Sequence, residues 1–225
     1  MRCVFAAGAA AVAVASSLSS AQFVTVDPGL FTNIEDRFEA RIRLDGGNSQ
    51  TWKTAIWEDT TLLATSGNVQ NFFASGVEKD FDLSYDALSG LVSLTVGDRV
   101  VSTNITLTPG TQLAGFRIFA TSQAGLGSSF INDLTAGADA GSLAIPDFGS
   151  DTADGFVDGP TYYLTSASDS ISLSGDAVFA WLAGANLQGE RYKVSIKVLE
   201  GVLVPAPGPL ALAGIGGLIA LRRKR

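Results

Sequence analysis

Three stretches of the chain alternate strictly between apolar and charged or polar residues, and this alternation limits the fold more than any other feature. Residues 37–44 read RFEARIRL, residues 80–85 read DFDLSY and residues 191–198 read RYKVSIKV. Successive side chains of a β-strand point to opposite faces, so a period of two predicts strands with one face in a core and one in water. Between the two ends of the chain, no window of about ten or more residues has the apolar face of an amphipathic helix.

Turn signals separate the strand-like segments. Gly97-Asp98 has the composition of a two-residue hairpin turn, and Pro109-Gly110 marks another turn. Residues 22–203 are long enough to form one domain that buries most of the surface of the unfolded chain. The sequence therefore predicts an all-β fold, an antiparallel two-sheet β-sandwich of the jelly-roll-like kind over residues 22–203. A closed barrel is the alternative.

The chain has no histidine, and its one cysteine is Cys3. This excludes Ser-His-Asp and Cys-His catalysis, His-based metal sites, an intramolecular disulfide and iron–sulfur clusters. The pairs Glu35/Asp36 and Glu58/Asp59 could serve a glycosidase. Adjacent acids at strand ends are more often solvated turns, however, so we expect the protein not to be an enzyme.

Residues 1–21 have the features of a signal peptide. Arg2 is followed by an apolar stretch of small residues and a short polar exit. Ser19 and Ala21 precede Gln22 with the small-x-small spacing that a signal peptidase requires. We therefore expect an N-terminal signal helix that is cleaved between Ala21 and Gln22. A buried N-terminal helix is the alternative.

The other end of the chain combines an apolar stretch with a cluster of positive charges. No charged residue occurs from Gly201 to Leu221, and four cations then close the chain: Arg222, Arg223, Lys224 and Arg225. As a helix, the apolar part after the prolines would span about 20 Å, less than the ~30 Å hydrocarbon core of a bilayer. Under the positive-inside rule the four cations form a membrane stop on the cytoplasmic side and leave the rest of the chain outside.

A Pro-x-Pro motif precedes this short hydrophobic helix, in the order Val204, Pro205, Ala206, Pro207, Gly208. Residues 204–225 thereby resemble the PEP-CTERM sorting signal of Gram-negative-type bacteria, although Ala206 stands where that signal usually has glutamate. The resemblance implies a tail that holds the protein in the inner membrane until an exosortase-like enzyme cleaves it near the prolines. It also implies release to the cell surface or the exopolysaccharide matrix. A permanent single-pass anchor is the alternative.

The domain between the two ends is similar to the choice-of-anchor domains, type W most closely. The similarity rests on FEARI at 38–42, the strand-like segment 81–85, LTVG at 94–97 and FAW at 179–181. That family has no established catalytic activity, so the resemblance implies an architecture and a location but no chemistry. We therefore expect an exported structural or adhesive protein of the cell surface or exopolysaccharide matrix. A carbohydrate- or calcium-binding module is the alternative.

Charge separates the domain from the two ends. All 22 Asp and Glu lie between Asp27 and Glu200, together with ten of the 15 Lys and Arg, which gives this part a net charge of −12. Such a domain repels the phosphate backbone, so we expect no nucleic-acid partner. The expected partners are a signal peptidase, an exosortase-like enzyme, exopolysaccharide and, transiently, the inner membrane.

Two sets of residues are candidates for ligand binding. Calcium is held by oxygen ligands from flexible loops, and four acids are interspersed with glycines and small polar residues: Asp147, Asp151, Asp154 and Asp158. Their spacing is not that of a known calcium loop, and a solvated acidic connection is the alternative. We expect no other cofactor.

Five aromatic residues could form a platform that stacks on sugar rings, namely Trp52, Trp57, Trp181, Tyr162 and Tyr163, and we select Trp57 and Tyr162 as the candidates. If residues 52–57 form a regular strand, Trp52 and Trp57 point to opposite faces, so one of them is exposed unless the strand is buried on both sides. An exposed tryptophan on an exported β-sandwich favours carbohydrate binding. The alternative is that these aromatic rings anchor the core between the sheets.

Overall fold

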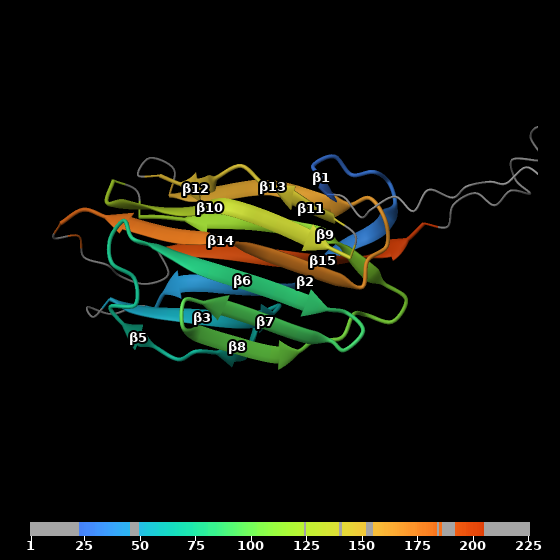
Figure 1. The fold of residues 1–225 in the computed structure, drawn as a ribbon, viewed down its shortest axis with the longest axis horizontal. Helices are drawn as coiled ribbons and strands as arrows, with labels where there is room; N and C mark the ends of the chain where they lie inside the picture. Colours follow the sequence, from blue (N-terminus) through green and yellow to red (C-terminus); the bar gives the residue numbers. More distant parts are fainter. Residues whose placement is uncertain are drawn as a thin grey trace, which may run out of the picture.

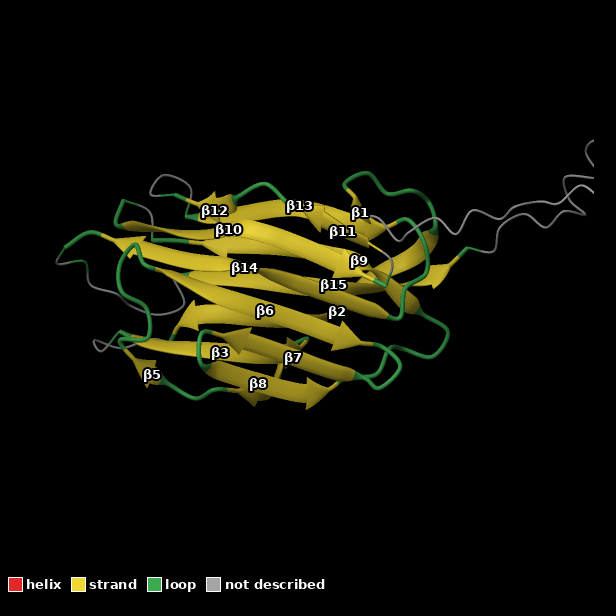
Figure 2. Cartoon of the chain, in the orientation of Figure 1, coloured by secondary structure: helices red, strands yellow, loops and turns green. Residues whose placement is uncertain are grey.

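The computed structural model describes residues 23–45, 50–123, 125–139, 141–151, 155–183, 185 and 192–204. These residues form two antiparallel β-sheets that pack face to face (Figures 1 and 2). The predicted all-β, antiparallel two-sheet sandwich is thus confirmed. Within the described ranges no helix is long and apolar enough to cross a membrane. The signal and anchor helices predicted for the two ends lie outside them.

The first sheet, sheet A, has the strand order β1-β13-β9-β15-β2-β3-β4, with β5 paired to β3. Its centre is formed by three long strands, of which β15 pairs with β9 on one side and β2 on the other. The strands of sheet A are β1 (Phe23–Val24), β2 (Phe31–Leu44), β3 (Thr51–Glu58), β4 (Thr61–Thr65), β5 (Val69–Gln70), β9 (Gln112–Thr121), β13 (Phe156–Leu164) and β15 (Lys193–Leu203).

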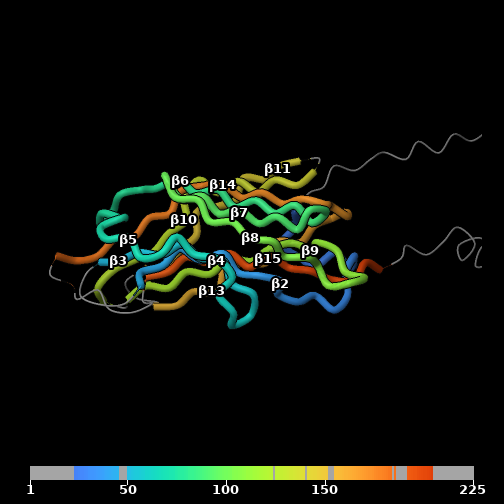
Figure 3. Tube along the Cα trace, turned by 90° about the horizontal axis from the view of Figure 1, so that it is seen from below, coloured from blue at the N-terminus to red at the C-terminus, as the bar shows by residue number. Residues whose placement is uncertain are grey.

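The second sheet, sheet B, has the order β11-β10-β14-β6-β7-β8, with β12 paired to β10. Seen from below, the two sheets form two layers (Figure 3). From β9 onwards the long strands alternate between the layers, so neighbours in a sheet are distant in sequence. The strands of sheet B are β6 (Glu78–Asp86), β7 (Leu91–Val96), β8 (Arg99–Asn104), β10 (Gly127–Ala138), β11 (Gly141–Ala144), β12 (Phe148–Ser150) and β14 (Ser170–Trp181).

The apolar members of each alternating stretch form the core between the layers. Their charged neighbours lie on the outer faces, as a period of two requires. Each fully buried valine, leucine, isoleucine or phenylalanine side chain stabilises the fold by about 1.5–3 kcal/mol relative to an exposed one. Buried in this way are Phe38, Ala40, Ile42 and Leu44 of β2, Phe81, Leu83 and Tyr85 of β6, and Val194, Ile196 and Val198 of β15.

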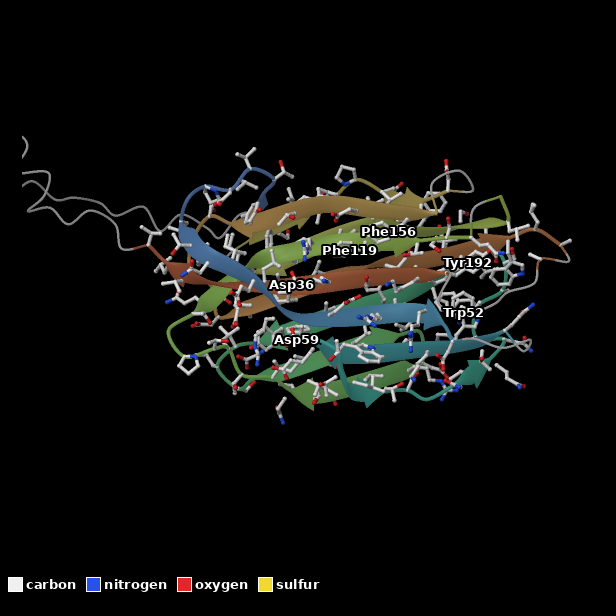
Figure 4. The ribbon with its side chains drawn as sticks, turned by 180° about the vertical axis from the view of Figure 1, so that it is seen from behind. Asp36, Trp52, Asp59, Phe119, Phe156 and Tyr192 are labelled. Atoms are coloured by element: carbon white, nitrogen blue, oxygen red, sulfur yellow. The ribbon has the colours of Figure 1, made fainter. Side chains whose placement is uncertain are left out.

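An aromatic cluster around Trp52 closes one end of the core. Trp52 is buried, and its ring centroid lies 4.7 Å from that of Phe73 and 4.6 Å from that of Phe179. In Figure 4, Trp52 and Tyr192 lie together at this end. Trp57, five positions further along β3, is on the opposite face and only partly buried, so Trp52 is the tryptophan of this strand that belongs to the core.

Close contact between β9 and β13 depends on Gly115. Its φ is 149°, in the range that glycine adopts most readily, and a Cβ at this position would collide with the carbonyl oxygen of Tyr162. Gly110, in the loop before β9, also has a positive φ, but a Cβ there would have nothing within 4 Å. Gly115 is therefore required by packing as well as by backbone conformation.

We expect Gly115→Ala to lower the free energy of unfolding by about 3 kcal/mol or more, because β13 must move to relieve the collision. The control, Gly110→Ala, should cost about 1 kcal/mol through its backbone conformation alone. Urea unfolding followed by tryptophan fluorescence measures both. Equal losses in the two variants would contradict the role of the β9–β13 contact.

Candidate functional site

The register of sheet A places its outward-facing residues in rows that cross β3, β2, β15 and β9. One row is Lys53, Arg43, Lys193 and Thr121; the second is Ala55, Arg41, Ser195 and Phe119; the third is Trp57, Glu39, Lys197 and Arg117. We call these twelve residues, with Asp36, the sheet A face. It holds six of the ten Lys and Arg of residues 22–203. Acids lie among these cations: Asp36 and Glu39 are part of the face, Asp45 pairs with Arg43 and Lys53, and Asp158 is the register partner of Phe119.

Asp36 joins three strands of this face. Its carboxylate accepts hydrogen bonds of 2.6 Å from Arg117 of β9 and 2.6 Å from Lys197 of β15. Partial burial raises the pKa of Asp36, but these two hydrogen bonds and the positive charges of their donors lower it below its ordinary value. The carboxylate is therefore ionised at neutral pH and acts only as a hydrogen-bond acceptor.

An open groove with a volume of about 460 Å³ lies beside this ion pair. We call it the Asp36 groove; its polar and aromatic lining comes from Glu35, Asp36, Asp59, Arg117, Thr161 and Tyr163. Asp36 extends from β2 and Asp59 from the turn between β3 and β4, as Figure 4 shows. Irregular pairing occurs next to the groove, between β15 and β2 and between β13 and β9. Such bulges bend strands and redirect side chains.

The groove offers hydrogen-bond acceptors, one guanidinium donor and an aromatic ring. Asp36 and Asp59 supply carboxylate oxygens, Arg117 supplies N–H donors and Tyr163 supplies the ring. Ligands with many hydroxyl groups and an apolar ring face satisfy this combination. The arrangement can therefore orient a sugar ring by hydrogen bonds at its edge and contact at its face.

The two aromatic residues selected from the sequence do not form a common platform. Trp57 is on the outer face of sheet A, where the guanidinium carbons of Arg41 and Arg43 lie 4.7 and 5.5 Å from its ring centroid. Tyr162 is 5% exposed and stacks on Phe116 inside the sandwich. The expectation of a joint platform is therefore wrong, because alternation along β13 turns Tyr162 inward and its neighbour Tyr163 towards the groove.

The four candidate calcium ligands are distributed over separate elements. Asp147 precedes β12 in sheet B, where its carboxylate accepts a hydrogen bond from the backbone of Asp133. Asp151 follows β12, whereas Asp158 is on β13 in sheet A. Asp154 lies outside the described residues, and within the described ones no group of three or more acids is placed to hold a metal ion. Calcium binding stays a prediction.

Most of the predicted processing sites also lie outside the described ranges. These are Ala21 and Gln22 at the signal cleavage site, Pro205, Ala206, Pro207 and Gly208 of the sorting motif, and the membrane stop from Arg222 to Arg225. Val204 is described: it follows β15, and its backbone N–H donates to the carbonyl oxygen of Leu30 at 2.8 Å.

The two acids of the groove, Asp36 and Asp59, belong to the adjacent-acid pairs that we interpreted as solvated turns. The structure brings both to one groove, because β2 and β3 are neighbours and β3 continues into the turn that carries Asp59. The sequence signal for these two acids was weak. Asp36 stands just before the alternating stretch 37–44, and Asp59 follows the strand-like segment 52–57.

A second charged surface lies on the outside of sheet B. We call it the sheet B face; its acids are Glu78, Asp80, Asp82, Asp86 and Asp176. Asp80 of β6 is the register partner of Asp176 of β14. Partial burial raises the pKa of Asp176, and its hydrogen bond with Asp80 and the negative charges of Asp80, Glu78 and Asp133 raise it further. Carboxylates on this face therefore repel one another.

Comparison of the chain with protein-family models and with curated proteins finds no match.

We expect Asp36→Asn to lower the free energy of unfolding at pH 7 by about 1 kcal/mol, because Arg117 and Lys197 lose their shared carboxylate. A lowered pKa contributes stability above the ordinary pKa and loses it as the pH falls through the lowered value. The difference between variant and wild type should therefore disappear at strongly acid pH. Urea titrations at both pH values measure it.

The control for this variant is Asp98→Asn. Asp98 also pairs with an arginine, Arg99, but its side chain is 78% exposed in the turn between β7 and β8. Its replacement should leave stability almost unchanged. A loss in Asp36→Asn that stays constant from neutral to strongly acid pH would contradict the ion-pair explanation.

Proposed function

We propose that the chain is an exported β-sandwich that binds polysaccharide and serves as a structural or adhesive component of the cell surface or exopolysaccharide matrix. The observation that carries the proposal is the Asp36 groove. It is open, it lies on one broad face of a slab-shaped domain, and carboxylates, a guanidinium and a tyrosine line it together. An open groove accommodates a segment within a long chain, whereas a closed pit accommodates only its end.

In this proposal Tyr163 contacts the apolar face of a sugar ring at the groove. Hydroxyl groups of the sugar donate to the carboxylates of Asp36 and Asp59 and accept from Arg117. The ion pair with Arg117 and Lys197 holds the Asp36 carboxylate in position before the ligand arrives. Such preorganisation reduces the entropy lost on binding.

The pKa of Asp36 argues against this residue as the proton donor of a glycosidase. A glycosidase of the two-carboxylate type needs one carboxyl group with a raised pKa as its proton donor. The pKa of Asp36 is instead lowered by its two cationic partners. Asp36 is thus suited to accept hydrogen bonds from a bound sugar and unsuited to protonate a leaving group.

We further propose that export and sorting use the two ends of the chain. A signal peptidase removes residues 1–21, and the tail from Val204 to Arg225 holds the protein in the inner membrane as a short helix until an exosortase-like enzyme cleaves it. The support is the order of sequence features in each segment. Alternation of the late strands between the sheets likewise supports the jelly-roll-like form of the sandwich.

This route predicts the mass of the mature protein in its native host. Intact-mass measurement of the surface and medium fractions should find a species that starts at Gln22 and ends between Pro205 and Gly208. A membrane species that keeps Arg222 to Arg225, with no shorter form outside the membrane, would instead establish a permanent anchor and contradict the sorting proposal.

We expect Tyr163→Ala to weaken polysaccharide binding about tenfold, the equivalent of ~1.4 kcal/mol. Affinity electrophoresis of the full chain in gels that contain the extracellular polysaccharide of the native host, dextran or alginate measures the effect. The matched control is Phe156→Ala, which removes an exposed ring from the same strand without changing the groove lining. Equal retardation of both variants and the wild type, or retardation of none, would contradict the proposal.

A further inference from the structure

Strand β8 is an unpaired edge of sheet B. It pairs with β7 from Arg99, opposite Val96, to Asn104, opposite Leu91, without a shift of register. Among the described residues no strand pairs with its other side. Such an edge presents backbone N–H and C=O groups that match another extended strand. We propose that β8 of one copy pairs antiparallel with β8 of a second copy and forms a two-fold dimer. The proposal stands independently of polysaccharide binding.

Alternation along the hairpin determines which backbone groups of β8 are open. Successive residues of an antiparallel strand direct their N–H and C=O groups to one neighbour and then to the other. The N–H of Ile105, just after β8, donates to the carbonyl oxygen of Gly90 beside β7 at 2.7 Å. The odd-numbered residues of β8 therefore face β7, whereas Val100, Ser102 and Asn104 direct their backbone groups away from the sheet. These three residues form the open edge.

The open edge lacks the features that keep β-edges from pairing. Charged side chains, prolines and bulges usually serve that purpose. The one charged residue of β8 is Arg99, at the hairpin end, where its side chain pairs with the neighbouring Asp98 at 3.4 Å. Next to it Val100 is 64% exposed. A regular, uncharged edge with an exposed valine is suited to pair with another strand.

Other edges of the sandwich are interrupted. β13 contains Pro160, which has no N–H group, and its pairing with β9 shifts between Asp158 and Thr161. The pairing of β4 with β3 shifts between Ile56 and Trp57. On the far side of sheet B the edge is divided between two short strands, β11 and β12. Among the described edge strands, β8 is therefore the longest that pairs without a shift, and association through it ends at a dimer.

Charge permits a second copy of this acidic domain to approach at the β8 edge. No charged residue occurs from Val100 to Phe116 or from Thr60 to Val77. These two stretches contain β8 and β4, which contact each other across the two layers. Figure 3 looks onto this side of the slab, with β4 beside β8. Two domains of net charge −12 repel each other least where neither surface carries an acid.

A second copy matches this edge better than a single extended peptide does. Both layers of the sandwich end here, and a two-fold axis perpendicular to the slab brings β8 against β8 and β4 towards β4. A lone peptide would pair with β8 only. If the axis passes between Ser102 and its copy, Val100 pairs with Asn104 of the second copy. In this register all three open residues of each copy exchange backbone hydrogen bonds.

The charges nearest to the edge are too distant to oppose this pairing. In the proposed register the two copies of Asp98 are about 27 Å apart, at ~3.4 Å per residue, which exceeds the Debye length of about 10 Å at 0.1 M ionic strength. Added salt screens the repulsion between the two acidic domains but does not break backbone hydrogen bonds. The dimer should therefore persist or strengthen as the ionic strength rises to about 1 M.

Replacements of Ser102 test the register directly, because this residue faces its own copy across the axis. Sedimentation velocity of the full chain, without polysaccharide, should find a dimer whose population increases with concentration. Ser102→Lys and Ser102→Glu each place like charges opposite one another and should weaken dimerisation about tenfold or more. An equimolar mixture of the two variants places opposite charges across the axis and should recover the dimer.

The matched controls are Ser84→Lys and Ser84→Glu. Ser84 lies in the same outward-facing row, two strands from the edge, since it is the register partner of Ser93, which in turn pairs with Ser102. Both controls should dimerise like the wild type. Equal dimerisation of all four variants, or a mixture that associates no better than either Ser102 variant alone, would overturn the proposal.

The wild type decides the question even if a variant fails to fold. A wild type that stays monomeric would overturn the dimer and leave the β8 edge to an extended strand of another protein. A wild-type dimer that dissociates at about 1 M salt would also overturn the proposal, because such a contact would depend on facing charges.

Discussion

The antiparallel register of β2, β15 and β9 determines nearly everything that the outer surface of sheet A can do. It places Phe38, Ile42 and their partners in the core and their charged neighbours on the other side of the same strands. A slip of one residue would exchange the faces, burying Arg41 and exposing Phe38. The hydrophobic core therefore also positions the surface charges, and the rows of cations are a direct result of the packing inside.

Asp36 shows how a partly buried charge can organise a site. The carboxylate connects β2 to β9 and β15, strands whose contacting residues are 81 and 161 positions away in sequence. Formation of such an ion pair costs desolvation, so its net contribution to stability is small, whereas removal of one partner leaves the others unsatisfied. Its main effect is on geometry: Arg117 and Asp36 are held at the edge of a groove that irregular strand pairing opens beside them.

Local patterns predicted the strands and the side of each that is buried, because alternation is a property of neighbouring residues. The stretches around Phe38, Phe81 and Val194 all behave in this way. Strand order could not be predicted, since nothing near Arg117 or Tyr163 specifies that β9 lies between β13 and β15. For the same reason the net charge of −12 was evident, but the gathering of cations on one face was not. Tyr162 was misassigned because its facing depends on a register shift in β13 that has no clear signature in the sequence.

The position of β15 has a mechanical consequence. This strand ends at Leu203, at the end of the slab where β1 also lies (Figure 1), and it is hydrogen-bonded to both β2 and β9 along its length. Tension applied to the chain beyond Val204 would act along the strand axis, so that both ladders resist in shear and share the force among many hydrogen bonds. Peeling, which opens bonds one at a time, would require a force perpendicular to the strand. A pull on this end of the domain is therefore resisted by a strand of sheet A that is hydrogen-bonded to a neighbour on each side.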